Sequence, residues 1–399
     1  MLKNKTVVLA VSGSIAAYKI ANLARMCKKL GADVQVLMTQ NATMFINPIT
    51  FESLTGNKCL IDTFDRNFQY SVEHVALAKK ADVVMIAPAS ANVIGKIANG
   101  IADDMLTTTV MACTCKKIIS PAMNHNMYHN PIVQDNIKKL ARFGYEIVAP
   151  DNGMLANGDI GDGRMPDENI LLQYIIRECA FPKDLTGNKV LVTAGATREP
   201  IDPVRFITNH STGKMGYSIA ENAAMRGAYV TLISAHAEIE PPMFVNLVKV
   251  NTAREMFDEV ISRFEESDIV IKAAAVADYT PKRTAEQKIK KTDGDTVIEL
   301  VRTPDILAEL GKRKTHQFLC GFSMETENLI ENSKGKLIRK NLDMIAANSL
   351  KVEGAGFGTD TNVLTLITKD DIVELPLMSK QQAAAAVFDK IISTTTRKQ

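Results

Sequence analysis

Two stretches of the chain share one pattern of hydrophobic and polar positions. Residues Thr6–Lys19 and Asn188–Gly216 each open with a short apolar run, pass through a segment rich in Gly, Ser and Thr, and enter an amphipathic stretch. Short apolar runs bounded by turn residues are typical of buried parallel strands, and amphipathic stretches predict helices. The pattern therefore predicts a nucleotide-type α/β fold that starts twice.

In the first half, apolar runs alternate with amphipathic stretches, which predicts a parallel sheet covered by helices on both faces. The expected strands are Val7–Val11, Asp33–Met38, Val83–Ala87, Lys117–Ser120 and Glu146–Val148. The expected helices are Ile15–Leu30 and residues 48–54, 71–79, 91–99, 103–112 and 130–142. The glycine-rich segment Asp151–Pro166 has little apolar periodicity and predicts a long mobile loop, a kind of segment that is often functional.

The second half repeats the scheme. Its expected strands are Lys189–Thr193, Tyr229–Ser234 and residues 269–273, 318–322 and 363–367, and its expected helices are Met215–Arg226 and Lys380–Ser393. Pro, Gly and Asn near residues 183–188 indicate a linker. The prediction is thus two Rossmann-like domains, residues 1–182 and 189–399, each with a mostly parallel sheet flanked by helices.

Composition narrows the function classes. The 399 residues include 47 basic and 45 acidic side chains, a net charge of +2, which gives no electrostatic reason to expect binding to nucleic acid or a membrane. The six cysteines form no regular framework, which favours reduced thiols in a cytosolic protein. No apolar stretch reaches the length of a membrane span. We therefore expect a cytoplasmic protein.

Polar residues follow two of the expected strands in the first half. Gly13 and Ser14 lie between a strand and a helix, where free backbone N–H groups and the helix dipole favour a phosphate. The full G-x-G-x-x-G pattern of dinucleotide sites is absent, so a mononucleotide such as FMN fits better. Ser90 and Asn92 follow the strand Val83–Ala87 and could hydrogen-bond a flavin. An ordinary strand-to-helix turn with capping serines is the alternative interpretation.

Two further residues suggest chemistry at this site. His74 lies in YSVEHVALAKKAD near an expected helix start, and imidazole is suited to proton transfer at neutral pH. Taken alone, a single histidine is more often a surface or core residue. Asn124, in SPAMNHNMYHNP, can donate a hydrogen bond to a carboxylate without adding charge. Such a donor is useful where a carboxylate must bind and still be lost as CO2.

These motifs resemble the flavin-containing cysteine decarboxylases. The segments GSIAAYK, SVEHVAL, PASANVIGKIANGIADDML and PAMNHNM match in order over nearly all of residues 1–180. The resemblance implies FMN, which oxidises the cysteinyl CH2–SH so that the carboxylate can leave, with His74 as the base. It implies that Asn124 and Met127 contact the substrate. The residues that we assign to FMN are Gly13, Ser14, Thr39, Ser90 and Asn92.

One position departs from that family. The family's flap has Ala-Cys-Gly before the G-x-G-R-M segment, whereas this chain has Asn157 in place of the cysteine. The family cysteine is thought to protonate the enethiolate in the final reduction, and an amide has no proton of similar acidity. The hypothesis is that oxidation and decarboxylation proceed while the final reduction is slowed.

Polar groups of the second half predict a nucleotide site. The segment Gly195–Gly216 contains Arg205 and Asn209 and ends in Ser-Thr-Gly-Lys-Met-Gly, where backbone N–H groups could hold phosphate oxygens. Its spacing is not that of a Walker A loop. Asp278 follows an expected strand and suits Mg²⁺. A polar helix cap and a solvated basic loop are the alternatives for these segments.

This half resembles the phosphopantothenate–cysteine ligases. AGATREPIDPVRFITNHSTGKMG is the most specific signature, and AAVADY, KIKK, GFSMET and KNLDMIAAN follow in family order. The resemblance implies that CTP activates 4′-phosphopantothenate as an acyl-cytidylate and that the amine of cysteine then displaces CMP. The implied substrate and catalytic residues are Asn209, Arg205 and Lys288. The implied CTP residues are Asp278, Lys288, Phe322 and Lys340, with Asp278 also holding Mg²⁺.

Together the halves resemble the bifunctional phosphopantothenoylcysteine decarboxylase/phosphopantothenate–cysteine ligases of coenzyme A synthesis. The ligase half makes the amide that the decarboxylase half consumes. The resemblance implies a homo-oligomer with trimeric flavin domains and dimeric ligase domains, a dodecamer. Two alternatives stay open: a flavin-binding regulatory protein without decarboxylase turnover, and a nicotinamide oxidoreductase suggested by the paired Rossmann-like openings.

Overall fold

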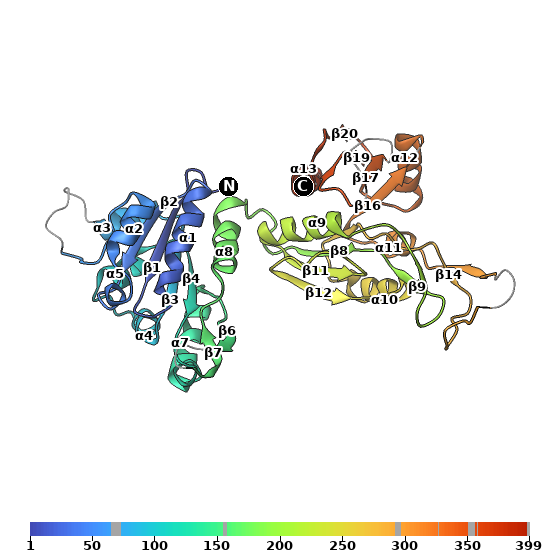
Figure 1. The fold of residues 1–399 in the computed structure, drawn as a ribbon. Helices are drawn as coiled ribbons and strands as arrows, with labels where there is room; N and C mark the ends of the chain where they lie inside the picture. Colours follow the sequence, from blue (N-terminus) through green and yellow to red (C-terminus); the bar gives the residue numbers. More distant parts are fainter. Residues whose placement is uncertain are drawn as a thin grey trace. The chain divides into compact units, whose positions relative to one another are not determined.

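The chain forms two compact units, Met1–Phe181 (unit 1) and Pro182–Gln399 (unit 2), in the computed structural model (Figure 1). The structure describes residues 1–64, 73–154, 158–291, 297–325, 327–349, 356 and 358–396. Each unit has its own sheet and its own buried side chains on both faces of that sheet. The units are therefore described one at a time.

Unit 1 contains a five-stranded sheet in the order β2-β1-β3-β4-β5, with every pair of neighbouring strands parallel. The strands are β1 (Thr6–Val11), β2 (Asp33–Met38), β3 (Val83–Ala89), β4 (Lys116–Pro121) and β5 (Glu146–Ile147). The chain moves outward from β1 in one direction to β2 and in the other to β3. The carboxyl ends of β1 and β3 therefore form a topological switch point, where open α/β sheets bind ligands.

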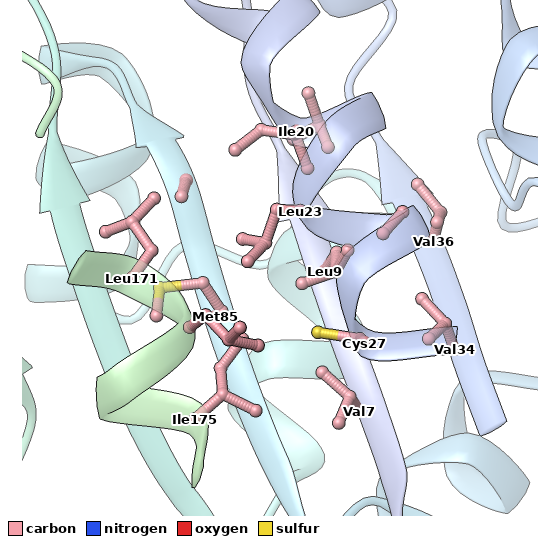
Figure 2. Packing of buried hydrophobic residues seen from close by; sticks show 14 of the residues in the cluster. Val7, Leu9, Ile20, Leu23, Cys27, Val34, Val36, Met85, Leu171 and Ile175 are labelled. Atoms are coloured by element: carbon pink, nitrogen blue, oxygen red, sulfur yellow. The ribbon is translucent and has the colours of Figure 1, made fainter. Parts of the chain in front are cut away.

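Helices cover both faces of this sheet. They are α1 (Ala17–Lys29), α2 (Pro48–Thr55), α3 (Glu73–Lys80), α4 (Ala91–Ala98), α5 (Met105–Ala112), α6 (His125–Tyr128), α7 (Pro131–Arg142) and α8 (Glu168–Ala180), with a 3-10 turn at Ala42–Met44. Alternate residues of β1 enter the two cores: Val7 and Leu9 pack with α1 and α8, whereas Val8 packs with α4, α5 and α7. Figure 2 shows the first core, with Leu23 and Leu171 directed at the sheet. This period of two produces the three-layer arrangement.

The segment expected to be a long mobile loop is instead a hairpin, so that prediction was wrong. Strands β6 (Asp151–Met154) and β7 (Ile160–Arg164) pair antiparallel. The Met123 N–H donates to the Gly163 carbonyl at 3.0 Å, which ties the hairpin to the segment before α6. A Cβ at Gly163 would lie 2.2 Å from the Met123 carbonyl oxygen. Glycines here allow close backbone approach. Burial alternates along β7, but its buried positions are Gly161 and Gly163, so no alternation of apolar side chains reveals the strand in the sequence.

Unit 2 contains an eight-stranded sheet in the order β12-β11-β8-β13-β16-β17-β19-β20. Its strands are β8 (Lys189–Ala194), β11 (Tyr229–Ser234), β12 (Val245–Lys249), β13 (Ile269–Lys272), β16 (Phe318–Glu325), β17 (Met344–Ser349), β19 (Leu364–Thr368) and β20 (Ile372–Glu374). The first six strands are parallel, and the last two join antiparallel. The first six have the Rossmann order, with a switch point between β8 and β13.

Among the described residues of unit 2, two helices cover one face of the sheet and three cover the other. The first pair is α9 (Lys214–Met225) and α13 (Lys380–Thr396), and the other three are α10 (Ala253–Phe264), α11 (Ile306–Arg313) and α12 (Leu329–Arg339). Short antiparallel pairs complete the unit: β9 (Arg198–Pro200) with β10 (Phe206–Thr208), β14 (Tyr279–Pro281) with β15 (Leu300–Arg302), and β18 (Thr361–Asn362) with β21 (Met378–Ser379). The predicted fold class, two Rossmann-like halves with mostly parallel sheets, is confirmed.

Residues 183–188, which the sequence suggested as a linker, pack onto unit 2. Leu185 is buried in its core, and the Asp184 carboxylate forms an ion pair with the buried Arg226 at 2.5 Å. Arg226 also pairs with Asp389 of α13 at 2.7 Å. Among the helices that the structure describes, none combines the length and apolar character needed to cross a membrane.

Candidate functional site

A buried hydroxyl joins two loops at the switch point of unit 1. The Ser12 Oγ donates to the Pro88 carbonyl at 2.6 Å and accepts from the Ser90 N–H at 2.8 Å. The Ser12 N–H also donates to the Pro88 carbonyl at 3.2 Å. These bonds hold the loop after β1 against the loop after β3. Ser12 directly precedes the GSIAAYK motif, and no pattern in the sequence indicated this bridging role.

The residues predicted to hold FMN follow β1, β2 and β3, which are neighbours in the sheet, so the structure brings them to one edge. A Cβ at Gly13 would lie 2.7 Å from the Asn41 Cβ, so only glycine fits there. The buried Thr39 accepts a backbone N–H through its Oγ1 at 3.2 Å. The Ser90 Oγ accepts from a backbone N–H of α4 at 3.4 Å and caps that helix. Ser14 is half-buried and Asn92 exposed.

A pocket of about 540 Å³ adjoins this edge of unit 1. It brings Ser14 of the β1 loop together with Asn124, which caps α6. The Asn124 Oδ1 accepts from the Asn126 N–H at 2.9 Å, so its Nδ2 remains a donor for a ligand. Lys19 and Arg164 also line the pocket and give it a positive character that suits an anionic ligand. Sequence analysis missed both, since they come from segments far apart in the chain.

Two other predicted residues, His74 and Met127, are not brought into this pocket, and a third lies outside the described part of unit 1. His74 is half-buried in the first turn of α3 and is absent from the pocket wall. Met127 lies on α6 and is 48% exposed, also outside the wall. Asn157 lies outside the described residues.

Unit 2 has a pocket of about 360 Å³ at its own switch point. The loop Ser211–Gly216 at the start of α9, the segment Lys272–Val276 after β13 and Phe322 of β16 line it. Asp278, predicted for the nucleotide, lines the same pocket. Within the described chain, the buried Asn348 Oδ1 at this wall has no hydrogen-bond partner, which leaves an acceptor for a ligand. The pocket therefore brings two of the predicted residues, Asp278 and Phe322, together.

A second pocket of about 360 Å³ shares Lys272 and Asp278 with the first. It brings in Lys340, another predicted residue, whose Nζ pairs with Asp305 Oδ2 at 2.7 Å. Burial, followed by repulsion from Lys340, lowers the pKa of Lys272 to about 8. Sequence analysis missed Lys272, although a lysine that ends the apolar run Ile269–Ile271 is an unusual residue for a buried strand.

The remaining predicted residues of unit 2 lie beside these pockets and do not line them. The Asn209 Nδ2 donates to the carbonyl of Ala275, a wall residue, at 3.2 Å. Arg205 donates to the Asp202 carboxylate at 2.6 and 2.9 Å and to the Ile289 carbonyl at 2.7 Å. Its hydrogen bonds hold the pKa of Asp202 well below the ordinary value. Arg205 thus anchors the segment in which the exposed Lys288 precedes Ile289.

Each unit matches a known protein family. A family model described as Flavoprotein matches residues 1–180, and one described as DNA/pantothenate metabolism flavoprotein C-terminal domain matches residues 185–395. The coenzyme A biosynthesis bifunctional protein CoaBC of Bacillus subtilis (strain 168) is 47% identical over 397 residues, which cover 98% of this chain and 97% of that protein. CoaBC of Vibrio cholerae serotype O1 is 44% identical over 393 residues, 98% of each chain.

A solved structure of the C-terminal domain of CoaBC is 44% identical and covers 54% of this chain and 99% of that one, with a TM-score of 0.47. The two family models together span nearly the whole chain, in the order of the two units. The full-length relatives match both units at once. The chain therefore belongs to the family of bifunctional coenzyme A biosynthesis proteins, enzymes with phosphopantothenoylcysteine decarboxylase and phosphopantothenate–cysteine ligase activities.

Proposed function

We propose that unit 1 binds FMN at the switch point between β1 and β3 and decarboxylates 4′-phosphopantothenoylcysteine beside it. The observation that carries this proposal is the strand order β2-β1-β3-β4-β5, the order of flavodoxin-like folds, which bind FMN at this point. The residues fit such a group. The absence of a Cβ at Gly13 lets the loop after β1 lie against Asn41, and within the described chain the buried Ser120 Oγ at the end of β4 has no partner.

Within the unit 1 pocket, each side chain has a proposed task. Asn124 donates its amide to the substrate carboxylate, and Lys19 and Arg164 attract the anionic substrate electrostatically. Bound FMN supplies reversible acceptance of two electrons. Because the Asn124 side chain is neutral, it orients the carboxylate without stabilising its charge as a cation would. That difference favours release of CO2.

The position of His74 supports the proposed trimer of flavin domains. As a base, His74 must reach the substrate, yet it is absent from the pocket of its own unit. We propose that a neighbouring subunit supplies it. The segment 44–49 offers an apolar surface for such a contact: Met44 is 84% exposed, Phe45 50% and Ile49 59%.

Unit 2, in this proposal, binds CTP and forms the acyl-cytidylate of 4′-phosphopantothenate. Phe322 contacts the base, and Lys272 and Lys340 attract the phosphates. Asp278 and the phosphates together hold Mg²⁺. Asn209, bonded to the pocket wall, holds the acyl carbonyl, and Lys288 stabilises charge as cysteine displaces CMP. Arg205 then acts by anchoring the segment of Lys288.

The β14–β15 arm of unit 2 supports the proposed pairing of ligase domains. Tyr279, Leu300 and Val301 on this arm are 48%, 43% and 38% exposed, and Val297 beside it is 91% exposed. Exposed apolar side chains clustered on one arm are typical of an association surface. Trimeric flavin domains combined with dimeric ligase domains would give a dodecamer. Light scattering of the purified protein measures this mass directly.

A coupled assay that resolves pyrophosphate, CO2 and saturated thiol tests both halves. With CTP, 4′-phosphopantothenate and cysteine, we expect pyrophosphate release. Asn209→Ala should slow amide formation more than it weakens CTP binding, because Asn209 contacts the acyl group. Asn246→Ala, an exposed asparagine on β12, is the matched control and should change neither rate. An equal loss of CTP affinity and amide formation in Asn209→Ala would contradict its role.

The same assay tests Asn157. We expect CO2 to form faster than saturated thiol, because an amide cannot supply the proton that the family cysteine supplies. Asn157→Cys should bring the two rates together. Equal rates in the unmodified protein would overturn this interpretation. No CO2 from a protein that binds FMN would instead identify unit 1 as a regulatory flavoprotein.

A further inference from the structure

Two histidines and an aspartate meet outside the pockets described above. His125 is the first residue of α6, and His129, four residues later, is its C-cap. The backbone N–H of His129 donates to the His125 carbonyl at 3.0 Å. Their ring centroids are 4.4 Å apart. Asp162 of β7 places its Oδ2 2.8 Å from the His129 Nε2. One ligand atom from each of the three side chains lies within 4.8 Å of the others.

The backbone fixes this arrangement. A Cβ at Gly161 would lie 2.6 Å from the His125 Nδ1, so β7 can approach α6 this closely only because that residue is glycine. The Asp162 N–H donates to the same Nδ1 at 3.1 Å. Together with the Met123–Gly163 bond at 3.0 Å, this contact attaches the hairpin to the α6 segment at two points. These backbone contacts therefore bring together the two elements that carry the three side chains.

The donor atoms are in states suited to a cation. Because the His125 Nδ1 accepts a hydrogen bond, it carries a lone pair. The Asn152 Nδ2 donates to Asp162 Oδ1 at 2.9 Å, which orients the carboxylate so that its other oxygen faces His129. Such outer partners are typical of ligands held for a metal. His129 is exposed and the other two are half-buried, so an ion can enter from solvent.

We propose that His125, His129 and Asp162 form a binding site for a divalent transition-metal ion, of which Zn²⁺ is the reference. Two imidazoles and one carboxylate suit Zn²⁺, Co²⁺, Ni²⁺ or Cu²⁺, whereas Mg²⁺ and Ca²⁺ prefer all-oxygen sites. Three protein ligands leave one position of a tetrahedral ion open for water. This site is distinct from the proposed Mg²⁺ position at Asp278, which lies in unit 2.

The ion would join two elements that border the unit 1 pocket. Asn124, Gly163 and Arg164 line that pocket. His125 directly follows Asn124, and Asp162 directly precedes Gly163. On binding, the ion exchanges the His129–Asp162 hydrogen bond and the Asp162 N–H contact for ligand bonds, and the His129 Nε2 proton passes to solvent. The hairpin β6–β7 is then pinned to α6, one residue from the proposed carboxylate donor.

Titration of Zn²⁺ into the chelator-treated full chain, with a competing metal dye, tests the site. We expect one ion per chain, with affinity weakened about tenfold or more in His129→Gln and in Asp162→Asn. Millimolar Mg²⁺ should not compete. The matched control is His316→Gln. The His316 Nε2 lies 4.0 Å from an Asp268 carboxylate oxygen, but this pair belongs to no group of three possible metal ligands among the described residues. Cys115→Ser tests whether a thiol binds the ion and should leave the affinity unchanged.

Hydrogen exchange supplies a readout that does not depend on a variant that folds. Zn²⁺ should slow amide exchange in β6, β7 and α6 of the unmodified protein and leave unit 2 unchanged. Equal affinity in His129→Gln and the unmodified chain would overturn the proposal. Loss of the ion in Cys115→Ser, or protection confined to other elements, would overturn it as well.

Discussion

At the scale of single residues, the unit 1 pocket depends on a neutral donor. Asn124→Asp keeps the oxygen that accepts the Asn126 N–H but replaces the donor by a negative charge. We expect kcat/KM for decarboxylation to fall about 10- to 100-fold, because a hydrogen bond to a charged group contributes about 1.5–3 kcal/mol. Asn130→Asp is the control: Asn130 caps α7 in the same way, with its Oδ1 3.0 Å from a backbone N–H, outside the pocket. Equal losses in both variants would contradict the role of Asn124.

Lys272 predicts a pH dependence of nucleotide binding. Its folded pKa of about 8 lies below the ordinary lysine value, so without a ligand the folded state gains stability as pH rises above 8. Binding of CTP requires the protonated state of Lys272, since only the charged amine attracts phosphates. The dissociation constant of CTP should therefore rise above about pH 8 and stay flatter in Lys272→Gln. Isothermal titration at several pH values measures this, with the exposed Lys189→Gln as control. Parallel curves for Lys272→Gln and the unmodified chain would refute it.

Site residues differ in how far their positions could be predicted. Gly13, Ser14 and Ser90 could be placed after their strands because each follows a strong apolar pattern, whereas Thr39 was assigned only together with the resemblance. That Lys19 and Arg164 line one pocket could not be predicted, because their proximity depends on how the hairpin β6–β7 packs. Lys272 left a detectable signal at the end of its strand, but it lies outside the AAVADY motif that follows.

At the scale of elements, the hairpin β6–β7 depends on Gly163. This residue has a φ of +128°, and a Cβ there would meet the Met123 carbonyl at 2.2 Å. We expect Gly163→Ala to lower the free energy of unfolding of unit 1 by about 2 kcal/mol or more and to weaken FMN retention. Gly158→Ala isolates the contact from the backbone conformation, because its φ is +88° but no atom lies within 4 Å of a Cβ. Denaturant unfolding that shows equal costs would contradict the role of the contact.

Most buried, strongly patterned elements were predicted, although the buried strand β17 was missed. Strand β1 was expected at Val7–Val11 and forms at Thr6–Val11. Helix α1 begins at Ala17, two residues after the expected start, and the residues before it, Ser14–Ala16, line the pocket. Helix α10 was missed although the Thr252 Oγ1 caps it through the Glu255 N–H, a signal present in the sequence. The short pairs β9–β10 and β14–β15 left no apolar period to detect.

At the scale of the whole molecule, the two units have separate cores. The buried clusters of unit 1 end at Cys179, and those of unit 2 begin at Leu185. Units with complete cores fold as separate domains. We expect fragments 1–181 and 182–399 to fold alone, the first retaining FMN and the second releasing pyrophosphate from CTP when 4′-phosphopantothenate is present. Calorimetry of the intact chain should show two transitions. A single transition, together with fragments that stay unfolded, would contradict this independence.

The hydroxyl of Ser12 holds together two loops that lie more than seventy residues apart in the chain, so that they move as one rigid unit. A ligand held by both loops meets them already aligned, so little ordering entropy is lost on association. Alanine at that position would let the loops fluctuate separately, and calorimetric binding of the cofactor would then show a less favourable entropy. Affinity at this edge thus depends on a residue that the ligand need never touch.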